Sequence, residues 1–304
     1  WTVTSAAEGV DRVSGIEVLR FADRELTWNP ALAIYEEAPD PAKGFRMFAT
    51  DGFAGTIGGT GLVFGTAGTQ SITVADRAGS IAFDASFNRG GDRIVLSGNA
   101  ATWKASVAGS TIQLGDGDTS VAIPVGTTGT ELVFADGMRV LRYDATAAAV
   151  KIGSQSIGAG SVTLEAAGTV AGTLAGLDTA ASAKLFLPQT ITLEAGGKLA
   201  VFGTSGDAGV VLRAGDVTFD ASFNRGGDTL SFAQDGGDFT AVVAGSTVVL
   251  SDGASRYVIP VGTVGMMLDF ADGSRELVYD QFVQSVLIGT QQIGTTPVTL
   301  TDFG

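Results

Sequence analysis

The sequence predicts an all-β protein made of two tandem copies of a β-sandwich or β-roll-like domain, each about 120 residues long, an ordinary size for one domain. Glycine is abundant, with 44 residues, and only 16% of the chain is charged. Such a composition is typical of short strands joined by glycine turns. Apolar and polar residues alternate between the glycines, which is the period of a half-buried strand. The stretch FDASFNRGGD at residues 83–92 recurs unchanged at residues 219–228.

An internal duplication organises most of the chain. The repeated decapeptides are 136 positions apart, whereas VFGT at residues 63–66 and 201–204 is 138 apart, so the copies align with one slip of two residues. Further matching blocks are IPVG at 123–126 and 259–262 and FADG at 134–137 and 270–273. We therefore expect one β-domain at residues 47–165 and its copy at residues 185–304.

Three segments lie outside the copies. Residues 1–28 contain the same FAD turn in SGIEVLRFADRELTW, which predicts the last hairpin of an earlier, related β-module. Residues 29–46 start with Asn-Pro and place Leu32, Ile34 and Tyr35 near helical spacing, so we expect a short helix and linker there. Residues 166–184 form a small-residue linker, either extended or weakly helical. The chain begins at Trp1, which indicates a mature or trimmed chain.

Short strands separated by glycine turns account for each copy, and a sandwich, a barrel and a β-roll all remain possible. The buried positions should include Trp103 and the aligned Phe239, together with Tyr143 and Tyr279. No exposed aromatic platform stands out. The strands expected in the first copy are residues 71–74, 81–83, 93–96, 103–107, 111–114, 120–125, 131–134, 140–143 and 150–152.

The decapeptide lies between two strands and has three possible roles. Carboxylate and amide oxygens in a glycine loop suit Ca²⁺, which takes six to eight oxygen ligands. The same side chains could instead hold a tight turn by bonding to the backbone, and a catalytic loop is the third possibility. The candidate metal ligands are Asp84, Asn88, Asp92, Asp220, Asn224 and Asp228, with weaker candidates at Asp116, Asp118 and Asp252. Asp136 and Asp272 are interpreted as hairpin residues.

The charge and the missing residue types exclude several functions. A net charge of −14 argues against nucleic acid and against an anionic membrane, because both need a basic surface. The chain has no cysteine and no histidine, which removes disulfides, thiolate nucleophiles, imidazole bases and His or Cys zinc sites. No stretch is apolar enough to span a membrane. An enzyme is therefore not expected.

The segments GGDRIVL and GGDTLSF, at residues 90–96 and 226–232, resemble a degenerate half of the calcium-binding RTX motif G-G-x-G-x-D-x-U-x. DRVSGIEVLRFAD at residues 11–23 is similar to the segment that closes RTX arrays in type I secreted bacterial proteins, and the duplicated unit resembles modules of large secreted alphaproteobacterial proteins. The chain lacks the x-G-x step and the stacked nonapeptides, so the shared-site geometry of that family is not carried over. The resemblance implies secretion, Ca²⁺ and a role at the cell surface.

Together these patterns predict an extracellular structural protein of the bacterial surface. It would be a calcium-supported subunit of an adhesin, a surface layer or a filament in a biofilm matrix, associating with copies of itself through strand edges. The alternative is a calcium-dependent carbohydrate-binding module of a larger secreted protein, with a surface polysaccharide as its partner.

Overall fold

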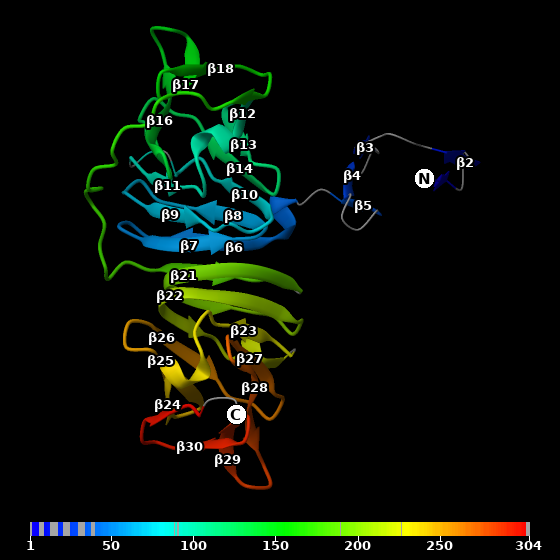
Figure 1. The fold of residues 1–304 in the computed structure, drawn as a ribbon, viewed down its shortest axis with the longest axis vertical. Helices are drawn as coiled ribbons and strands as arrows, with labels where there is room; N and C mark the ends of the chain where they lie inside the picture. The colour runs from blue at the N-terminus through cyan, green and yellow to red at the C-terminus, as the bar shows by residue number, and fades with distance from the viewer. Residues whose placement is uncertain are drawn as a thin grey trace. The chain divides into compact units, whose positions relative to one another are not determined.

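The computed structural model describes residues 40–301, except residues 88, 90, 189 and 226, and five strands within the first 37 residues. It divides into two units, Trp1–Asp40 and Pro41–Gly304 (Figure 1). No helix among the described residues is both long and apolar enough to cross a membrane.

The first unit consists of antiparallel strands. β1 (Thr2–Ser5) pairs with β2 (Gly9–Arg12), and β4 (Glu25–Asn29) lies between β3 (Val18–Arg20) and β5 (Ile34–Glu37). The prediction of a short helix at residues 29–46 is wrong, because β5 is a strand whose Tyr35 lies opposite Trp28. Three apolar residues within four positions do not distinguish a helix from a strand, and pairing with β4 decides for the strand.

The second unit is an all-β solenoid of about 10 layers in its described part. In the first copy the chain passes back and forth between two sheets, and the strands of successive layers pair in parallel. Sheet 1 contains β6 (Phe45–Ala49), β8 (Gly61–Phe64), β10 (Gly79–Phe83) and β14 (Thr119–Pro124). Sheet 2 contains β7 (Ala54–Gly58), β9 (Ser71–Val74), β11 (Arg93–Val95) and β15 (Thr130–Phe134).

The second copy repeats this winding with longer strands. Both β21 (Ile191–Phe202) and β22 (Ala208–Phe219) run through the two sheets without interruption. The layers are completed by β20 (Ala183–Phe186), β23 (Thr229–Ser231), β26 (Arg256–Pro260) and β27 (Met266–Phe270). The two-residue slip of the alignment falls at the connection from β9 to β10. Val74 and Gly79 align with Leu212 and Gly215, and the second pair is two positions closer in sequence than the first. The shorter connection makes β22 continuous.

Antiparallel hairpins cover the last parallel layer of each copy, at the end that lies away from the other copy. In the first copy they are β12 (Lys104–Ala108), β13 (Thr111–Gly115), β16 (Gly137–Asp144), β17 (Ala149–Ile152), β18 (Gln155–Ile157) and β19 (Val162–Thr163). In the second copy they are β24 (Thr240–Ala244), β25 (Thr247–Ser251), β28 (Gly273–Asp280), β29 (Ser285–Ile288), β30 (Gln291–Ile293) and β31 (Val298–Thr299). Short 3-10 turns lie at Pro41–Lys43, Ala100–Thr102, Phe223–Arg225 and Gly236–Asp238.

The two copies join through their first layers rather than following one another as separate sandwiches. β6 pairs antiparallel with β20, with Met47 opposite Leu185, and β7 pairs antiparallel with β21, with Ile57 opposite Ala195. Both sheets therefore continue across the junction, and the copies point in opposite directions (Figure 1). Each first layer is thus covered by the other copy in both sheets, so these strand edges are not free to pair with another chain.

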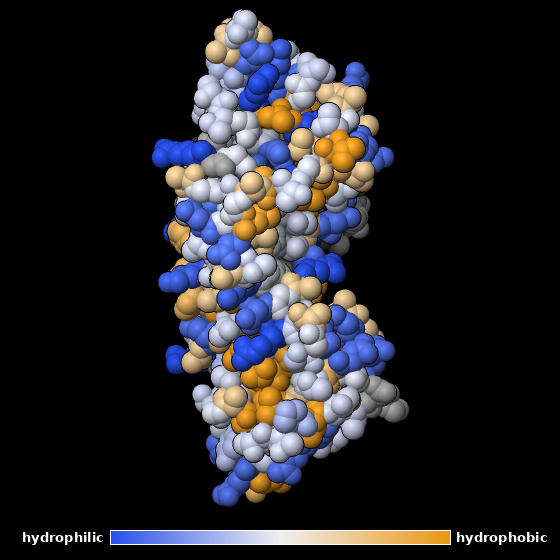
Figure 2. Space-filling model, turned by 90° about the vertical axis from the view of Figure 1, so that its left-hand side faces the viewer, coloured by the Kyte–Doolittle hydropathy of each residue, from blue (hydrophilic) through white to orange (hydrophobic). Residues whose placement is uncertain are grey.

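The core lies between the two sheets and follows the period-two pattern. Trp103 and Phe239 are buried as expected. The prediction that Tyr143 and Tyr279 are buried is wrong, because they are 41% and 38% exposed. Arg142 and Tyr143 are adjacent and both exposed, so both faces of this strand end meet solvent. The face drawn in Figure 2 shows hydrophobic side chains in small patches separated by hydrophilic ones.

Candidate functional site

The repeated decapeptide forms the corner between sheet 1 and sheet 2 in the third layer of each copy. In the first copy this corner follows β10, and in the second copy it follows β22. Phe87 and Phe223 are fully buried, with ring centroids 4.7 Å from those of Phe83 and Phe219 respectively. The second aromatic residue of the decapeptide therefore anchors the corner in the core.

The first aspartate of each corner holds its own turn. The Oδ1 atom of Asp84 accepts hydrogen bonds from the Ser86 backbone N–H at 3.2 Å, from Ser86 Oγ at 2.5 Å and from the Gly65 N–H at 3.4 Å. Asp220 accepts the equivalent bonds from Ser222 and Gly203. For Asp84 and Asp220 these bonds therefore favour a turn stabilised by side-chain-to-backbone bonds over a metal site. The bonds from Gly65 and Gly203 also connect the third layer to the second.

The last aspartate of each corner is buried, and only one of its two carboxylate oxygens accepts a hydrogen bond. Asp92 is 0% exposed and Asp228 is 1% exposed. Asp92 Oδ1 accepts the Gln70 N–H at 2.8 Å, and Asp228 Oδ1 accepts the Ala208 N–H at 2.9 Å. The Oδ2 atom of each is buried and has no hydrogen-bond partner in the described part of the chain. Such an orphan oxygen needs a proton, a water or a cation.

Burial sets the protonation of these two groups. Loss of hydration raises the pKa of Asp92 to about 7, although its backbone hydrogen bonds act in the opposite direction. Loss of hydration also raises the pKa of Asp228 to about 6, with a smaller upward contribution from the nearby Asp207. Both carboxyl groups therefore change charge near neutral pH.

The described residues supply some, but not all, of the oxygen ligands that a calcium ion needs. Each corner supplies one unpartnered carboxylate oxygen, on Asp92 or Asp228. Among the described residues no three acidic side chains gather to hold a metal. Asn88 and the side chain of Asn224 lie outside the described residues. A bound Ca²⁺ would thus take most of its six to eight oxygens from backbone carbonyls, water and these amides.

The weaker candidates lie in hairpin turns of the end layers. Asp116 Oδ1 accepts the N–H groups of Asp118 and Thr119, at 3.1 and 2.8 Å, between β13 and β14. Asp252 Oδ1 accepts those of Ala254 and Ser255, at 2.9 and 2.6 Å, between β25 and β26. Asp116 and Asp252 therefore shape turns, and Asp118 is exposed beside the first of them.

A buried arginine completes the FADG hairpin, and the sequence analysis missed it. Arg139 is 4% exposed and forms an ion pair with Asp136 at 2.8 Å. The hydrogen bond from Arg139 lowers the pKa of Asp136, which also accepts the Ala100 N–H. Arg275 and Asp272 form the same pair at 2.5 Å in the second copy. The signal was the arginine three positions after each aspartate, in FADGMR and FADGSR.

An aromatic row crosses the junction on the outer face of sheet 1. Phe48 stacks on Phe64 with centroids 4.7 Å apart, and Phe186 stacks on Phe202 at 4.8 Å. Phe48 and Phe186 meet edge to face at 5.8 Å across the junction. In the register, Lys184 lies opposite Phe48 and Arg46 lies opposite Phe186. The sequence alone does not indicate this platform, because the four rings come together only through the antiparallel junction.

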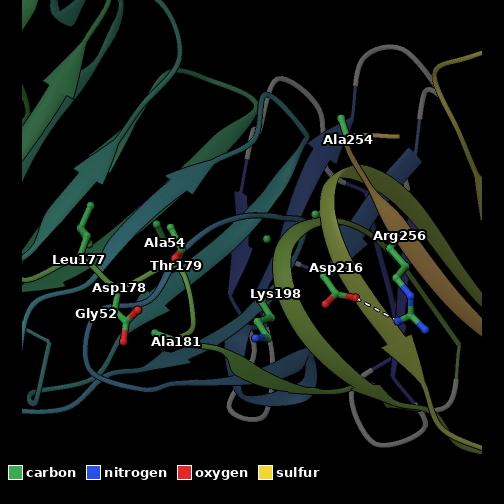
Figure 3. Close-up of a pocket in the computed structure, with 12 residues that line it drawn as sticks. Gly52, Ala54, Leu177, Asp178, Thr179, Ala181, Lys198, Asp216, Ala254 and Arg256 are labelled. Carbon is green, nitrogen blue, oxygen red and sulfur yellow. Dashed lines mark hydrogen bonds and ion pairs between the residues drawn. The ribbon is translucent and has the colours of Figure 1, made fainter. Parts of the chain in front are cut away.

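A cleft of about 660 Å³ lies at the turns near the junction (Figure 3). Its charged residues are Asp178, Lys198 and the ion pair of Asp216 with Arg256, whose nearest atoms are 3.5 Å apart. Both charge signs are present in equal number, so the cleft has no strong preference for a charged ligand.

Comparison with known proteins assigns the chain to no family. No family model matches the sequence, and none of the curated proteins matches it as a relative.

Proposed function

We propose that this chain is an extracellular structural protein of the bacterial surface, a calcium-supported subunit of an adhesin, a surface layer or a biofilm filament. A rigid solenoid with a duplicated unit suits a load-bearing or spacing role, in which repeated layers bury a continuous core. The resemblance of GGDRIVL and DRVSGIEVLRFAD to RTX segments supports type I secretion and calcium. With neither histidine nor cysteine in the chain, a non-catalytic role is the simpler one.

The role of calcium in this proposal is supported by two buried carboxylate oxygens that have no hydrogen-bond partner in the described part of the chain. Asp92 and Asp228 occupy equivalent corners, and each keeps one buried oxygen without a partner. A cation at this oxygen would compensate the burial of the carboxylate, which is otherwise unfavourable. It would also hold the third layer against the second, since the other oxygen binds the Gln70 or Ala208 N–H.

Calcium titration of the full chain tests this role. We expect 1 mM Ca²⁺ to raise the melting temperature at pH 8 above its value in EGTA, because a ligand of the folded state stabilises it by mass action. The double variant Asp92→Asn/Asp228→Asn should lose this response, whereas Asp116→Asn, in an exposed turn, should keep it. Equal melting temperatures in Ca²⁺ and EGTA for the wild-type chain would remove calcium from the proposal.

Light scattering tests the structural role itself. Assemblies that form at micromolar concentrations of the chain and dissolve in EGTA are the expected result. A chain that stays monomeric with and without Ca²⁺ would contradict an assembling subunit.

A carbohydrate-binding module is the second candidate, and the aromatic row favours it. Four phenylalanine rings with two flanking cations form an apolar, positively charged strip in an acidic protein, a surface suited to an anionic polysaccharide. Retention of the wild-type chain on an acidic glycan array, lost in Phe48→Ala/Phe186→Ala and kept in Phe282→Ala, would support this function. Retention that ignores the first variant would contradict it.

A further inference from the structure

A groove of about 640 Å³ lies at the far end of the second copy, between the β24–β25 hairpin and the strands β28, β29 and β30 (Figure 1). Its apolar residues come from both sides of the core. Val243 and Val261 lie on the β24–β26 side, and Tyr279, Val286 and Ile293 are neighbours in the register of the other three strands. The groove is thus an open end of the space between the two sheets.

Backbone hydrogen bonds hold the two sides of this groove together. The Val243 N–H donates to the carbonyl of Gly294 at 2.8 Å, and the Tyr279 N–H donates to that of Gly262 at 2.8 Å. The equivalent bonds of the first copy have the same lengths. The frame of the groove is therefore common to both copies.

Four of the positions that line the groove differ between the copies, and all four differ in the same direction. The other eight are identical, and they include the whole apolar wall. In each exchange the second copy has the larger hydrogen-bonding side chain: Gln284 for Ala148, Ser285 for Ala149, Gln292 for Ser156 and Thr295 for Ala159. The first copy forms the same frame without these side chains, so the fold does not require them.

The polar groups of these four residues are available to a ligand. Gln284, Gln292 and Thr295 are exposed. Ser285 lines the groove as well, and its Oγ atom is buried without a hydrogen-bond partner in the part of the chain that the structure describes. A buried hydroxyl of this kind needs a water or a ligand to complete its hydrogen bonding.

The hairpin tip between β28 and β29 holds Gln284 in place. Asp280 Oδ1 accepts the N–H groups of Phe282 and Val283 at 2.7 and 3.2 Å, and the first copy forms the equivalent two bonds at 3.0 and 3.1 Å. Gln284 has a φ of 53°, against 48° at Ala148. The exchange of alanine for glutamine thus leaves the tip in the same conformation and adds an amide beside the groove.

The groove is uncharged, although the chain is acidic. No charged residue occurs in the segments that supply all its residues except Tyr279, namely 239–251, 257–268 and 281–300. Glu276 and Asp280 alternate with Tyr279 along β28 and so lie on the other face of the strand, where Asp269 lies opposite Ser274. An anion would find no cation in the groove and carboxylates close by, which favours a neutral ligand.

We propose that this groove binds a neutral carbohydrate. A sugar ring combines an apolar face of C–H groups with hydroxyl groups around its edge. Tyr279, which is 38% exposed, and the valines contact the apolar face, and the amides and hydroxyls of the four exchanged residues bond the hydroxyl groups. The inference goes beyond the proposed function, because this site needs neither Ca²⁺ nor the aromatic row.

Isothermal titration calorimetry of the full chain in EGTA tests the site, with tetrasaccharides of glucose, galactose and mannose as probes. We expect one of the three to bind at one site per chain and tetragalacturonate not to bind. Binding should weaken at least ~10-fold in a variant with the residues of the first copy, Gln284→Ala/Ser285→Ala/Gln292→Ser/Thr295→Ala. The control Phe282→Thr/Val283→Ala, which makes the same kind of exchange at the neighbouring tip, should bind as the wild type does.

Three results of this titration would overturn the proposal. They are the absence of binding for all three neutral probes at millimolar concentrations, equal binding of tetragalacturonate, and a quadruple variant that binds as the wild type does.

The reverse exchange tests the site by a gain of binding, so a loss of folding cannot imitate the result. We expect two tetrasaccharides per chain in the variant Ala148→Gln/Ala149→Ser/Ser156→Gln/Ala159→Thr, and a stoichiometry that stays at one would contradict the assignment. Phe48→Ala/Phe186→Ala should leave tetrasaccharide binding unchanged, whereas its loss in that variant would place the site on the aromatic row. Failure of the acidic glycan test or of the calcium response leaves this result unaffected.

Discussion

The two copies are most alike at their corners and least alike at their far ends. At the corners, residues 83–92 and 219–228 are identical, and the hydrogen bonds of Asp84 and Asp92 recur at Asp220 and Asp228. At the ends the hairpin bonds recur as well, but the side chains that meet solvent differ. Threonine and alanine in one copy are replaced by phenylalanine and valine in the other.

This difference shows which residues the solenoid itself needs. A corner residue contacts its own layer and the layer before it, so a change there disturbs two layers at once. A hairpin tip contacts only its own turn, and it can therefore acquire a new surface without loss of the fold. The equivalent positions of the two copies supply matched pairs for testing this view.

The largest effect is expected where two layers approach through glycine. A Cβ atom at Gly79 would lie 2.3 Å from the carbonyl oxygen of Gly59, and one at Gly215 would lie 2.2 Å from that of Gly197. Gly79→Ala and Gly215→Ala should each lower the free energy of unfolding by about 3 kcal/mol or more, measured by urea denaturation. Gly215→Ala should cost more, because it lies within the continuous strand β22, whereas a looser connection precedes Gly79.

Two other glycines serve as controls for that pair. A Cβ atom at Gly158 or at Gly294 would have no neighbour within 4 Å. Alanine there should change the free energy of unfolding by less than about 0.5 kcal/mol. A similar loss at all four positions would show that contact between layers does not account for the cost of Gly79→Ala and Gly215→Ala, because backbone entropy alone would favour alanine.

The buried arginines should give the next largest effect. Arg275→Met and Arg139→Met each remove the buried cation of an ion pair, which should lower the free energy of unfolding by about 3 kcal/mol. The loss should be greater in the second copy, because the Asp272 side chain is 15% exposed and that of Asp136 is 35% exposed. Arg256→Met removes an exposed pair and should change the free energy by about 0.5 kcal/mol or less. Equal losses for all three would contradict the role of burial.

Local patterns were sufficient to predict the strands but not how they pair. The expected strands of the first copy all overlap observed ones, with bounds that differ by at most three residues, because a half-buried strand imposes a period of two. Five strands were missed, namely β6, β7, β8, β18 and β19, since short strands and Gly-rich segments such as 54–61 weaken that pattern. Parallel stacking depends on contacts between residues far apart in sequence, and an alternating pattern is the same in a sandwich and in a solenoid.

The candidate site was predicted as a set of residues but not as an arrangement. Identity between the copies located the corner, and its glycines indicated a turn. Only the fold separates Asp84, which bonds its own turn, from Asp92, which is buried with a free oxygen. Residue type cannot reveal burial, so the two aspartates were indistinguishable in sequence.

A change in pH should distinguish the two corners. In the folded chain the pKa of Asp92 is about 7 and that of Asp228 about 6, against an ordinary 3.8 when unfolded. The folded state therefore binds protons more tightly, so this contribution to stability is complete below pH 3.8 and is lost as the pH rises through 6 and 7. In EGTA, the melting temperature should rise by about 5 °C from pH 8 to pH 5.5.

Asparagine variants test the assignment, because the amide resembles the protonated acid. Asp92→Asn should remove most of the rise between pH 8 and pH 6.5 and a large share of the rise at lower pH, whereas Asp228→Asn should reduce mainly the rise below about pH 6.5. Asp116→Asn should leave the curve unchanged. A melting temperature that falls on acidification over this range would contradict the burial argument for both corners.

The smallest effect is expected at the hairpin tips. Asp144→Ala and Asp280→Ala each remove two hydrogen bonds to backbone N–H groups, but exposure to water keeps the loss of stability small. Asp144 also forms an ion pair with Lys151 at 3.0 Å, whereas Leu287 occupies the place of Lys151 in the second copy. Asp144→Ala should therefore lower the free energy of unfolding slightly more, and 0.5 M NaCl should reduce that difference.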